Sequence, residues 1–287
     1  MQLQSVFYTL LALIPSIAFS QSDVLPEKEV MYTTNTFYSS RIVNCHTTEL
    51  IVKKVLDFRI NHRFGLLSGG YQNFWGLDNA TMRMSFDYGL TDNLNVGIGR
   101  STFEKTVDGF AKYRFLRQIE DPGNMPISLA YIAGISMNGV EQPPNRTNYF
   151  TSRLSYLHQI VIARKFNAKF SAQLAPTLLH RNLIDSTHYQ HDVLALGIGL
   201  RQKILPSITL NLDYFLLAPD QIANIYRNPL SLGIDINTGW HTFQLHVTNA
   251  RGTFEKAILT QTTGRVGKGD LHFGFNISRE FHLGGYE

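Results

Sequence analysis

The sequence is poor in charge and nearly free of cysteine. Only 17% of its 287 residues are charged, against roughly 25% in typical soluble domains, yet the mean hydropathy is −0.10. This combination argues against both an ordinary soluble enzyme and a bundle of membrane-spanning helices. The single cysteine, Cys45, excludes an intrachain disulfide. Disorder is also excluded, because 12% of the residues are aromatic and the net charge is only +4.

The N-terminus is typical of an export signal. An apolar run extends from Val6 to Phe19, and the residues Ala18-Phe19-Ser20 match the small-x-small pattern of a cleavage site. We therefore predict a signal peptide at residues 1–20. The alternative is a buried N-terminal helix, since the run has no Lys or Arg ahead of it. Export without disulfides is typical of a cell-envelope protein.

Beyond the signal, apolar and polar residues alternate with a period of two. Between Ala80 and Gly89 every even position is apolar and every odd position is small or polar, the pattern of a strand with one apolar face. We count about twelve such segments, each about long enough to cross a membrane as a tilted strand. They are 56–64, 80–89, 94–99, 111–115, 127–137, 154–162, 170–178, 194–200, 208–216, 232–236, 243–247 and 271–277. We find no convincing helical period.

The connections alternate between short and long. Tight links are expected at 91–93, 166–167, 205–207 and 239–240, and long polar loops at 67–77, 139–148, 181–190, 218–229 and 250–267. Two links break the rule, because 104–106 is short and 118–125 is long. Short turns on one rim and long loops on the other are typical of outer-membrane barrels, in which the short turns are periplasmic. The pattern predicts an all-β fold, a transmembrane antiparallel up-and-down β-barrel of about 12 strands.

The basic residues of these segments decide which face points inward. An Arg or Lys facing lipid near the bilayer midplane costs about 2–4 kcal/mol. The strand faces that carry basic side chains must therefore line the lumen, and the apolar faces must contact lipid. The basic residues assigned to the lumen are Arg59, Arg63, Arg83, Lys112, Arg114, Arg153 and Arg201.

Two stretches of this chain resemble a known family. Residues 37–65 and 74–118 contain HRFG, GLDNA, DYGLTDNLNVGIGRS and DGFAKYR, which are similar to an uncharacterised family of Bacteroidota outer-membrane β-barrel proteins classed as a domain of unknown function. The resemblance covers most of the mature chain. It implies an outer-membrane barrel and implies no chemistry.

The predicted lumen contains more bases than acids. The candidate pore-lining residues are Arg59, Arg63, Arg83, Asp87, Lys112, Arg114, Arg153, Arg201, Asp213 and Asp235. One interpretation is a narrow pore that favours small anions, since about twelve strands enclose more space than eight. The other is an interior closed by Arg–Asp pairs across neighbouring strands, for which Asp57 and Asp87 lie close to Arg59 and Arg83.

The sequence offers little support for a metal site or for catalysis. His180, His188 and His191 are weak candidates for metal ligands, because their spacing matches no standard site. His158 and Ser152 share a strand face but are six residues apart, or about 20 Å, too far to act together. We predict no enzyme activity and no cofactor.

The residues before the first strand are the least regular, and they complete our predicted division of the chain. We expect a signal peptide at 1–20, a periplasmic N-terminal segment at 21–54 that folds against or into the barrel mouth and gates it, and an outer-membrane β-barrel at 55–287. The favoured function is a narrow channel or transport component for small, anionic solutes. The alternative is a closed structural or partner-binding barrel that acts through its long loops. We expect outer-membrane lipid and the barrel-assembly machinery as partners, and no nucleic acid.

Overall fold

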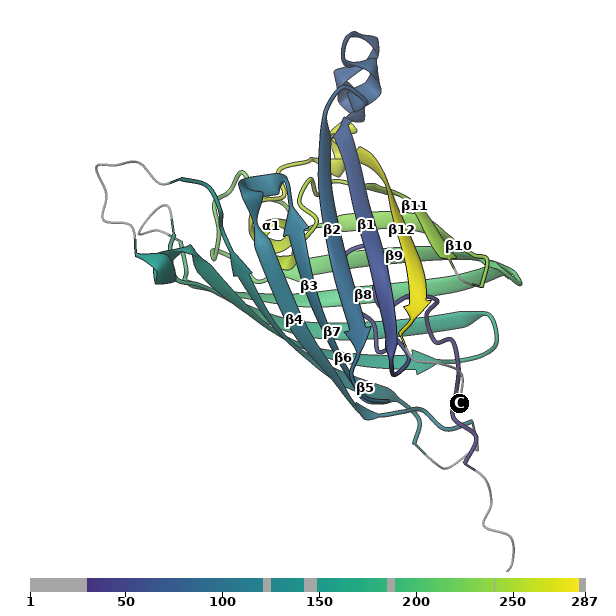
Figure 1. Cartoon of the computed structure of the whole chain (residues 1–287). Coiled ribbons are helices and arrows are strands. Elements are labelled where there is room, and N and C mark those ends of the chain that lie inside the picture. Colours follow the sequence, from purple (N-terminus) through teal and green to yellow (C-terminus); the bar gives the residue numbers. More distant parts are fainter. Residues whose placement is uncertain (1–29, 121–124, 142–148, 185–188, 240, 284–287) are drawn as a thin grey trace, which may run out of the picture. The chain divides into compact units, whose positions relative to one another are not determined.

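A computed structural model of the protein describes residues 30–120, 125–141, 149–184, 189–239 and 241–283. The predicted signal peptide lies outside these ranges. The chain divides into two units, 1–31 and 32–287, and the strands of the described ranges all belong to the second. These strands form a closed antiparallel barrel in which each strand pairs with its neighbours in sequence and β1 pairs with β12 (Figure 1). This confirms the predicted all-β barrel of twelve strands.

The strand bounds follow the alternating segments, with extensions at most ends. The strands are β1 (Val55–Leu66), β2 (Ala80–Gly89), β3 (Leu94–Ser101), β4 (Val107–Leu116), β5 (Ser128–Met137), β6 (Leu154–Lys165), β7 (Phe170–Arg181), β8 (Asp192–Leu205), β9 (Ile208–Leu217), β10 (Leu230–Asn237), β11 (His241–Thr248) and β12 (His272–His282). Short 3-10 helices lie in the connections: η1 (Leu67–Gly69), η2 (Tyr71–Gly76), η3 (Phe103–Lys105), η4 (Phe150–Arg153) and η5 (Val266–Lys268). The described residues also contain an α-helix, α1 (Glu255–Thr260).

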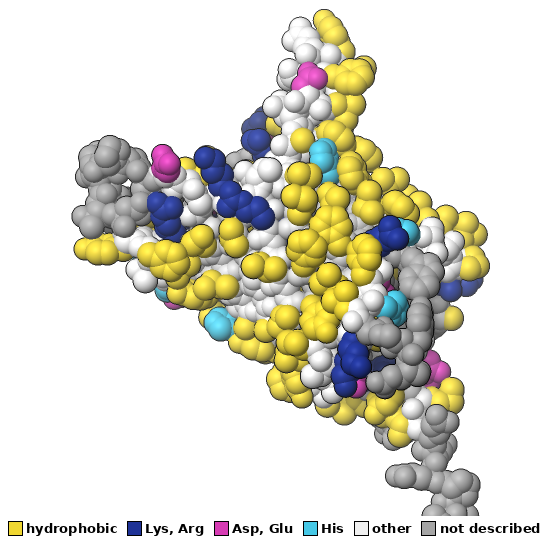
Figure 2. Space-filling view, viewed as in Figure 1, with side chains coloured by type: hydrophobic (Ala, Val, Ile, Leu, Met, Phe, Trp, Pro, Cys, Tyr) yellow, Lys and Arg dark blue, Asp and Glu magenta, His cyan; other side chains and the backbone are white. Residues whose placement is uncertain are grey.

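Register and alternation together sort the side chains between the two faces. In the β1–β2 pair, Ile60 lies opposite Met84 on the outer face and Arg59 lies opposite Ser85 on the inner face. The outer face is exposed and apolar, as Ile98 at 58% exposure illustrates, whereas Arg83 on the inner face is 1% exposed. Figure 2 shows hydrophobic side chains spread over the strands of the visible outer face. A one-residue slip would exchange the two faces, so the register is strongly specified.

The two ends of the barrel differ in their connections. At one end, which we call the turn end, the strands are joined through 90–93, 117–127, 166–169, 206–207 and 238–240. At the other, the loop end, they are joined through 67–79, 102–106, 138–153, 182–191, 218–229 and 249–271. The two irregular links expected from the sequence are present, since 102–106 is short and 117–127 is long. No helix in the described ranges is long and apolar enough to cross a membrane.

The interior of the barrel is occupied by two other parts of the chain. The first, the plug segment, comprises residues 33–50, which lie among inward-facing side chains of β1, β4, β8, β9 and β11. The second, the inner loop, comprises residues 249–262 of the β11–β12 connection and includes α1. Nearly all residues of both are buried or half-buried. Residues 33–50 of the predicted N-terminal segment thus lie within the lumen.

The lumen has two unlike walls. On β1–β4 and β9–β12 the inward side chains are mostly polar or charged, and we call this the polar wall. On β5–β8 many inward side chains are apolar, and we call this the apolar wall. The apolar wall, one residue of β9 and the two inner elements share one buried cluster: Cys45, Ile132, Leu157, Val161, Ala175, Leu179, Val193, Ala195, Phe215, Ile258 and Leu259. Alternation therefore weakens on these strands because both of their faces are apolar.

Candidate functional site

A tight turn at the tip of the plug segment is held by one carboxylate. The turn closes through a hydrogen bond from the Ile42 backbone N–H to the Cys45 carbonyl, 2.8 Å. Asp213 of β9 accepts the backbone N–H groups of Val43, Asn44 and Cys45 at 3.0, 2.6 and 3.3 Å, all on its Oδ2 atom. Successive amides that converge on one anion form a cradle of the kind that binds ions elsewhere. Asp213 is fully buried, so this carboxylate is the main anchor of the turn.

Three basic side chains of the barrel wall hold the remainder of the plug segment. Lys112 Nζ donates to the carbonyls of Ser40 and Glu49 at 2.8 and 3.1 Å. Arg201 donates to the carbonyls of Asn35 and Thr36 at 2.7 and 3.0 Å. Arg59 donates to the hydroxyls of Ser39 and Ser40 at 2.7 and 3.1 Å. The cations predicted to line a pore therefore bind a polypeptide, mainly through its backbone oxygens.

Arg63 connects the plug segment to the inner loop. Its guanidinium donates to the Asn44 side chain and to the carbonyls of Ala250 and Gly252. Asn44 in turn donates to Ser231 Oγ at 2.7 Å. The plug segment, the inner loop and the polar wall thus share one buried network, and removal of any member takes hydrogen bonds from its buried partners.

Glu255 of α1 is a second link between the two inner elements. Its carboxylate pairs with Arg41 and lies 3.1 Å from His46 Nε2, and both partners belong to the plug segment. Burial opposes ionisation of Glu255, but the Arg41 charge and the His46 contact hold its pKa well below the usual range. Burial, with help from Arg41, also keeps the pKa of His46 well below its ordinary value. The link is therefore an ion pair of Arg41 and Glu255 beside a neutral imidazole.

Glycines on the inner face make room for the plug segment. A Cβ at Gly199 of β8 would overlap the Ile42 side chain, and one at Gly233 of β10 would lie 3.0 Å from Val43. A Cβ at Gly197 would lie 3.3 Å from Cys45 Sγ. The wall therefore lacks side chains where the turn of the plug segment approaches it.

The predicted neutralisation between Arg and Asp occurs with different partners. Arg59 pairs with Asp57 on its own strand at 3.2 Å. Arg83 binds Asp108 of β4, with 2.9 Å from Nε to Oδ1, and Asp87 lies opposite Asp57 across the β1–β2 pair. Asp108 was not among the sequence candidates, although it shares its face with Lys112 and extending the alternating segment 111–115 by three residues would include it.

The other candidates occupy different levels of the barrel. Asp235 is buried on β10, beside Gln244 and Thr209 in the register. Arg114 lies near the turn end, where it donates to the Asp92 carbonyl at 3.1 Å. Arg153 ends η4 at the loop end and lines a cavity there. Most of the ten candidates therefore surround the plug segment and inner loop, while Arg114 and Arg153 mark the two mouths.

The histidine candidates have ordinary partners. His180 Nδ1 lies 2.7 Å from Asp192, and His191 Nδ1 lies 2.6 Å from the Arg181 carbonyl. His188 lies outside the described residues. Within the described ranges, no group of three or more His, Cys, Asp or Glu side chains could hold a metal ion.

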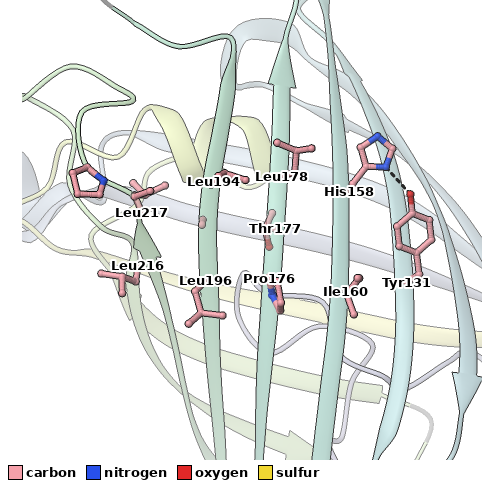
Figure 3. Close-up of a pocket in the computed structure, with 13 residues that line it drawn as sticks. Tyr131, His158, Ile160, Pro176, Thr177, Leu178, Leu194, Leu196, Leu216 and Leu217 are labelled. Carbon is pink, nitrogen blue, oxygen red and sulfur yellow. Dashed lines mark hydrogen bonds between the residues drawn. The ribbon is translucent and has the colours of Figure 1, made fainter.

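An apolar groove of about 690 Å³ lies on the outer surface of β5–β9 (Figure 3). It is lined by leucines of β7–β9 and by Pro176, which has no N–H to donate to a neighbouring strand. The β6–β7 register skips Pro176 and its neighbour Ala175, so the ladder is interrupted there. At one edge His158 Nδ1 lies 2.6 Å from the Tyr131 hydroxyl, which satisfies both groups on an apolar surface. The groove belongs to the lipid-contacting face predicted from the sequence.

Comparison with known proteins identifies the domain. A family model described as "Membrane bound beta barrel domain (DUF5777)" matches residues 37–281. No curated protein matches the chain. Similar solved structures include "KdgM porin" (TM-score 0.49, 9% identity, covering 79% of this chain and 99% of that one) and "NanC porin" (0.48, 9%, 79% and 98%). Another is an outer membrane channel from Pseudomonas putida F1 (0.47, 11%, 82% and 97%).

Proposed function

Because the chain belongs to this family of membrane-bound β-barrel domains, we propose that it is a gated channel of the outer membrane for small solutes, and that the structure is its closed state. The observation that supports this proposal is the way in which the plug segment is held. The polar wall binds it through hydrogen bonds from Arg59 and Lys112 and to Asp213, and Arg201 of β8 adds two more. Water can replace hydrogen bonds of this kind when a segment leaves, whereas it cannot replace apolar packing.

Release of the plug segment would expose three basic side chains of the wall and one acid, Asp213. Arg59, Lys112 and Arg201 would lose their contacts with it and would face water, while Arg83 would keep its partner Asp108. A passage lined in this way attracts anions, since a low-dielectric wall concentrates the field of its charges. We therefore propose small anions as the preferred solutes.

Two variants of the plug segment test the proposal by conductance in planar bilayers. Deletion of residues 33–50 removes the plug segment, and we expect a stable current where the full chain is mostly closed. The Gly197→Cys variant should do the opposite, because the introduced Cβ would lie 3.3 Å from Cys45 Sγ and a disulfide could tie the turn to β8. We expect a reducing agent to restore opening in this variant.

The control for the tether is Gly239→Cys, since a Cβ added at Gly239 would meet only open space and the residue lies in a connection of the turn end. Its conductance should not respond to reductant. Silence of a deletion variant that still shows the far-ultraviolet circular dichroism of a folded barrel would contradict the channel.

A closed barrel that acts through its loops is the second candidate. It is favoured by an aromatic projection on the β1–β2 loop, where Tyr71, Phe74 and Trp75 are 77%, 57% and 52% exposed. Phe74 and Trp75 also have positive φ angles of 44° and 50°, a conformation that costs free energy in bulky residues. Figure 1 shows this loop extending above the other connections of the loop end. Silence in the deletion experiment would favour this candidate.

A further inference from the structure

The apolar groove on the outer surface of the barrel lies between two rows of side chains that run across β6–β9 (Figure 3). The strand register fixes both rows, which are His158, Leu178 and Leu194, and Pro176, Leu196 and Leu216. Three strand spacings separate β6 from β9, or about 14 Å. With a volume of about 690 Å³, the groove is therefore long and wide enough for an alkyl chain.

The polar groups of the groove are confined to one edge. The polar side chains among its lining residues are Tyr131, His158 and Thr177. Thr177 is 4% exposed, and its hydroxyl donates to the Ala175 carbonyl and accepts from Gln159 Nε2, so it belongs to the inner face. The outward polar groups are thus those of Tyr131 and His158, on β5 and β6 (Figure 3).

This pair leaves one ring nitrogen unused. The Tyr131 hydroxyl lies 2.6 Å from His158 Nδ1, and when the phenol donates this hydrogen bond the ring hydrogen is on Nε2. His158 is exposed, and within the described part of the chain Nε2 has no hydrogen-bond partner. On a surface that contacts hydrocarbon, such a donor costs free energy until an acceptor reaches it.

The acceptor must belong to a molecule that is otherwise apolar. His158 is four residues from Leu154, the loop-end start of β6, or about 13 Å along the strand. A bulky lipid headgroup stays at the membrane surface, whereas a carboxyl group is small, and its hydrogen bond with an imidazole is charge-assisted. We propose that the groove binds a long-chain fatty acid, with the carboxyl group at Tyr131 and His158 and the alkyl chain along the leucines of β7–β9.

The wall behind the groove is packed and does not depend on the state of the lumen. On the inner face of the same strands, Val161, Ala175 and Val193 belong to the buried cluster that includes α1. Pro176, at the interruption of the β6–β7 ladder, would be covered from outside by the bound chain. The site needs no passage through the barrel, so it holds whether or not the barrel conducts.

A palmitate analogue with a photoreactive diazirine in its chain tests the site. The probe is added to the full-length chain in phospholipid vesicles and irradiated, and the labelled peptides are identified by mass spectrometry. We expect saturable labelling of β7–β9 that palmitate displaces and methyl palmitate does not. His158→Leu should lower the apparent affinity by about tenfold or more. The matched control is His241→Leu, which removes a histidine that shares the outer face of β11 with Phe243 and should leave the affinity unchanged.

A second variant fills the groove and leaves the polar pair in place. Leu196→Trp should abolish saturable labelling, whereas Ile98→Trp, on the outer face of β3 and outside the groove, should not. Circular dichroism establishes that each variant is folded. Equal affinity in His158→Leu and His241→Leu, or no saturable labelling of the unaltered chain, would overturn the proposal. Displacement by methyl palmitate as effective as by palmitate would mean that any acyl chain fills the groove, and the fatty-acid site would then be rejected.

Discussion

The polar wall and the apolar wall hold their occupants by different forces. The polar wall holds the plug segment through buried charges and hydrogen bonds, with Asp213 at the tip and Lys112 near the base. The apolar wall holds α1 through packing against Ile258 and Leu259. Burial of each such side chain stabilises the folded state by about 1.5–3 kcal/mol. Hydrogen bonds add less, because water competes for them.

This difference implies that the two inner elements separate at different cost. Most partners of the plug segment are polar groups that water can replace, and only a few of its side chains, such as Ile42 and Cys45, pack in the apolar clusters. Release of α1 would expose apolar surface on both sides. We therefore expect α1 to stay with the β5–β8 wall while the plug segment moves. Three substitutions test that division.

The largest effect is expected from Asp213→Asn. The amide cannot offer the charged acceptor that binds three backbone N–H groups, and disruption of a buried ionic site costs about 3–5 kcal/mol. Cys45, the only cysteine, reports release: its thiol is 1% exposed, and burial raises its pKa. Labelling of Cys45 by a membrane-impermeant maleimide should accelerate by about 100-fold or more. Asp92→Asn, an exposed residue at the turn end, is the control, and similar labelling rates in both variants would contradict Asp213 as the anchor.

Ile258→Ala should lower stability without opening the lumen. Removal of this buried side chain leaves a cavity against the apolar wall and should cost about 2–4 kcal/mol of the free energy of unfolding. The measurement is the thermal unfolding midpoint by circular dichroism, with planar-bilayer conductance recorded in parallel. Ile234→Ala, on the outer face at 43% exposure, should shift the midpoint less. A new current in Ile258→Ala would show that α1, rather than the plug segment, is the moving element.

Lys112→Met should have the smallest effect of the three. It removes two hydrogen bonds to the Ser40 and Glu49 carbonyls but also removes a buried charge, so the net loss is about 1–2 kcal/mol. Labelling of Cys45 should accelerate by roughly tenfold. Lys169→Met, an exposed residue of the β6–β7 turn, should label at the original rate. An unchanged rate in Lys112→Met would remove Lys112 from the set of residues that hold the plug segment.

The barrel was predictable from the sequence because the pattern that specifies each strand lies within that strand. Alternation specifies strands and faces residue by residue, and the cost of basic side chains in lipid assigns the inner face, as the burial of Arg59 and Lys112 shows. The irregular links at 102–106 and 117–127 were also visible as connection lengths. The weaker alternation of β5–β8 could not be interpreted from the sequence. The inner faces of these strands are apolar because α1 packs against them, and alternation within a strand does not show that contact.

The partners of the inner residues were not predictable. The plug segment has no period, and the wall binds it largely through backbone N–H and carbonyl groups, which every sequence possesses. The sequence indicated the plug segment only indirectly. Positions 197, 199 and 233 face inward and are glycines, although a lumen filled with water has room for side chains there. Asp108 is a simpler case, because it lies just outside the alternating segment 111–115.

The position of the plug segment has a consequence for the order of assembly. It precedes β1 in the chain, and only residues 51–54 separate it from that strand. The last pair to form in a barrel built in chain order is β1 with β12, the seam that joins its two ends. The plug segment binds β8, β9 and β11. It can make these contacts before β1 pairs with β12, so it does not have to enter a barrel that is already closed. We therefore expect the barrel to assemble around the plug segment. Deletion of the plug segment should then slow barrel assembly even if it increases the passage of solutes.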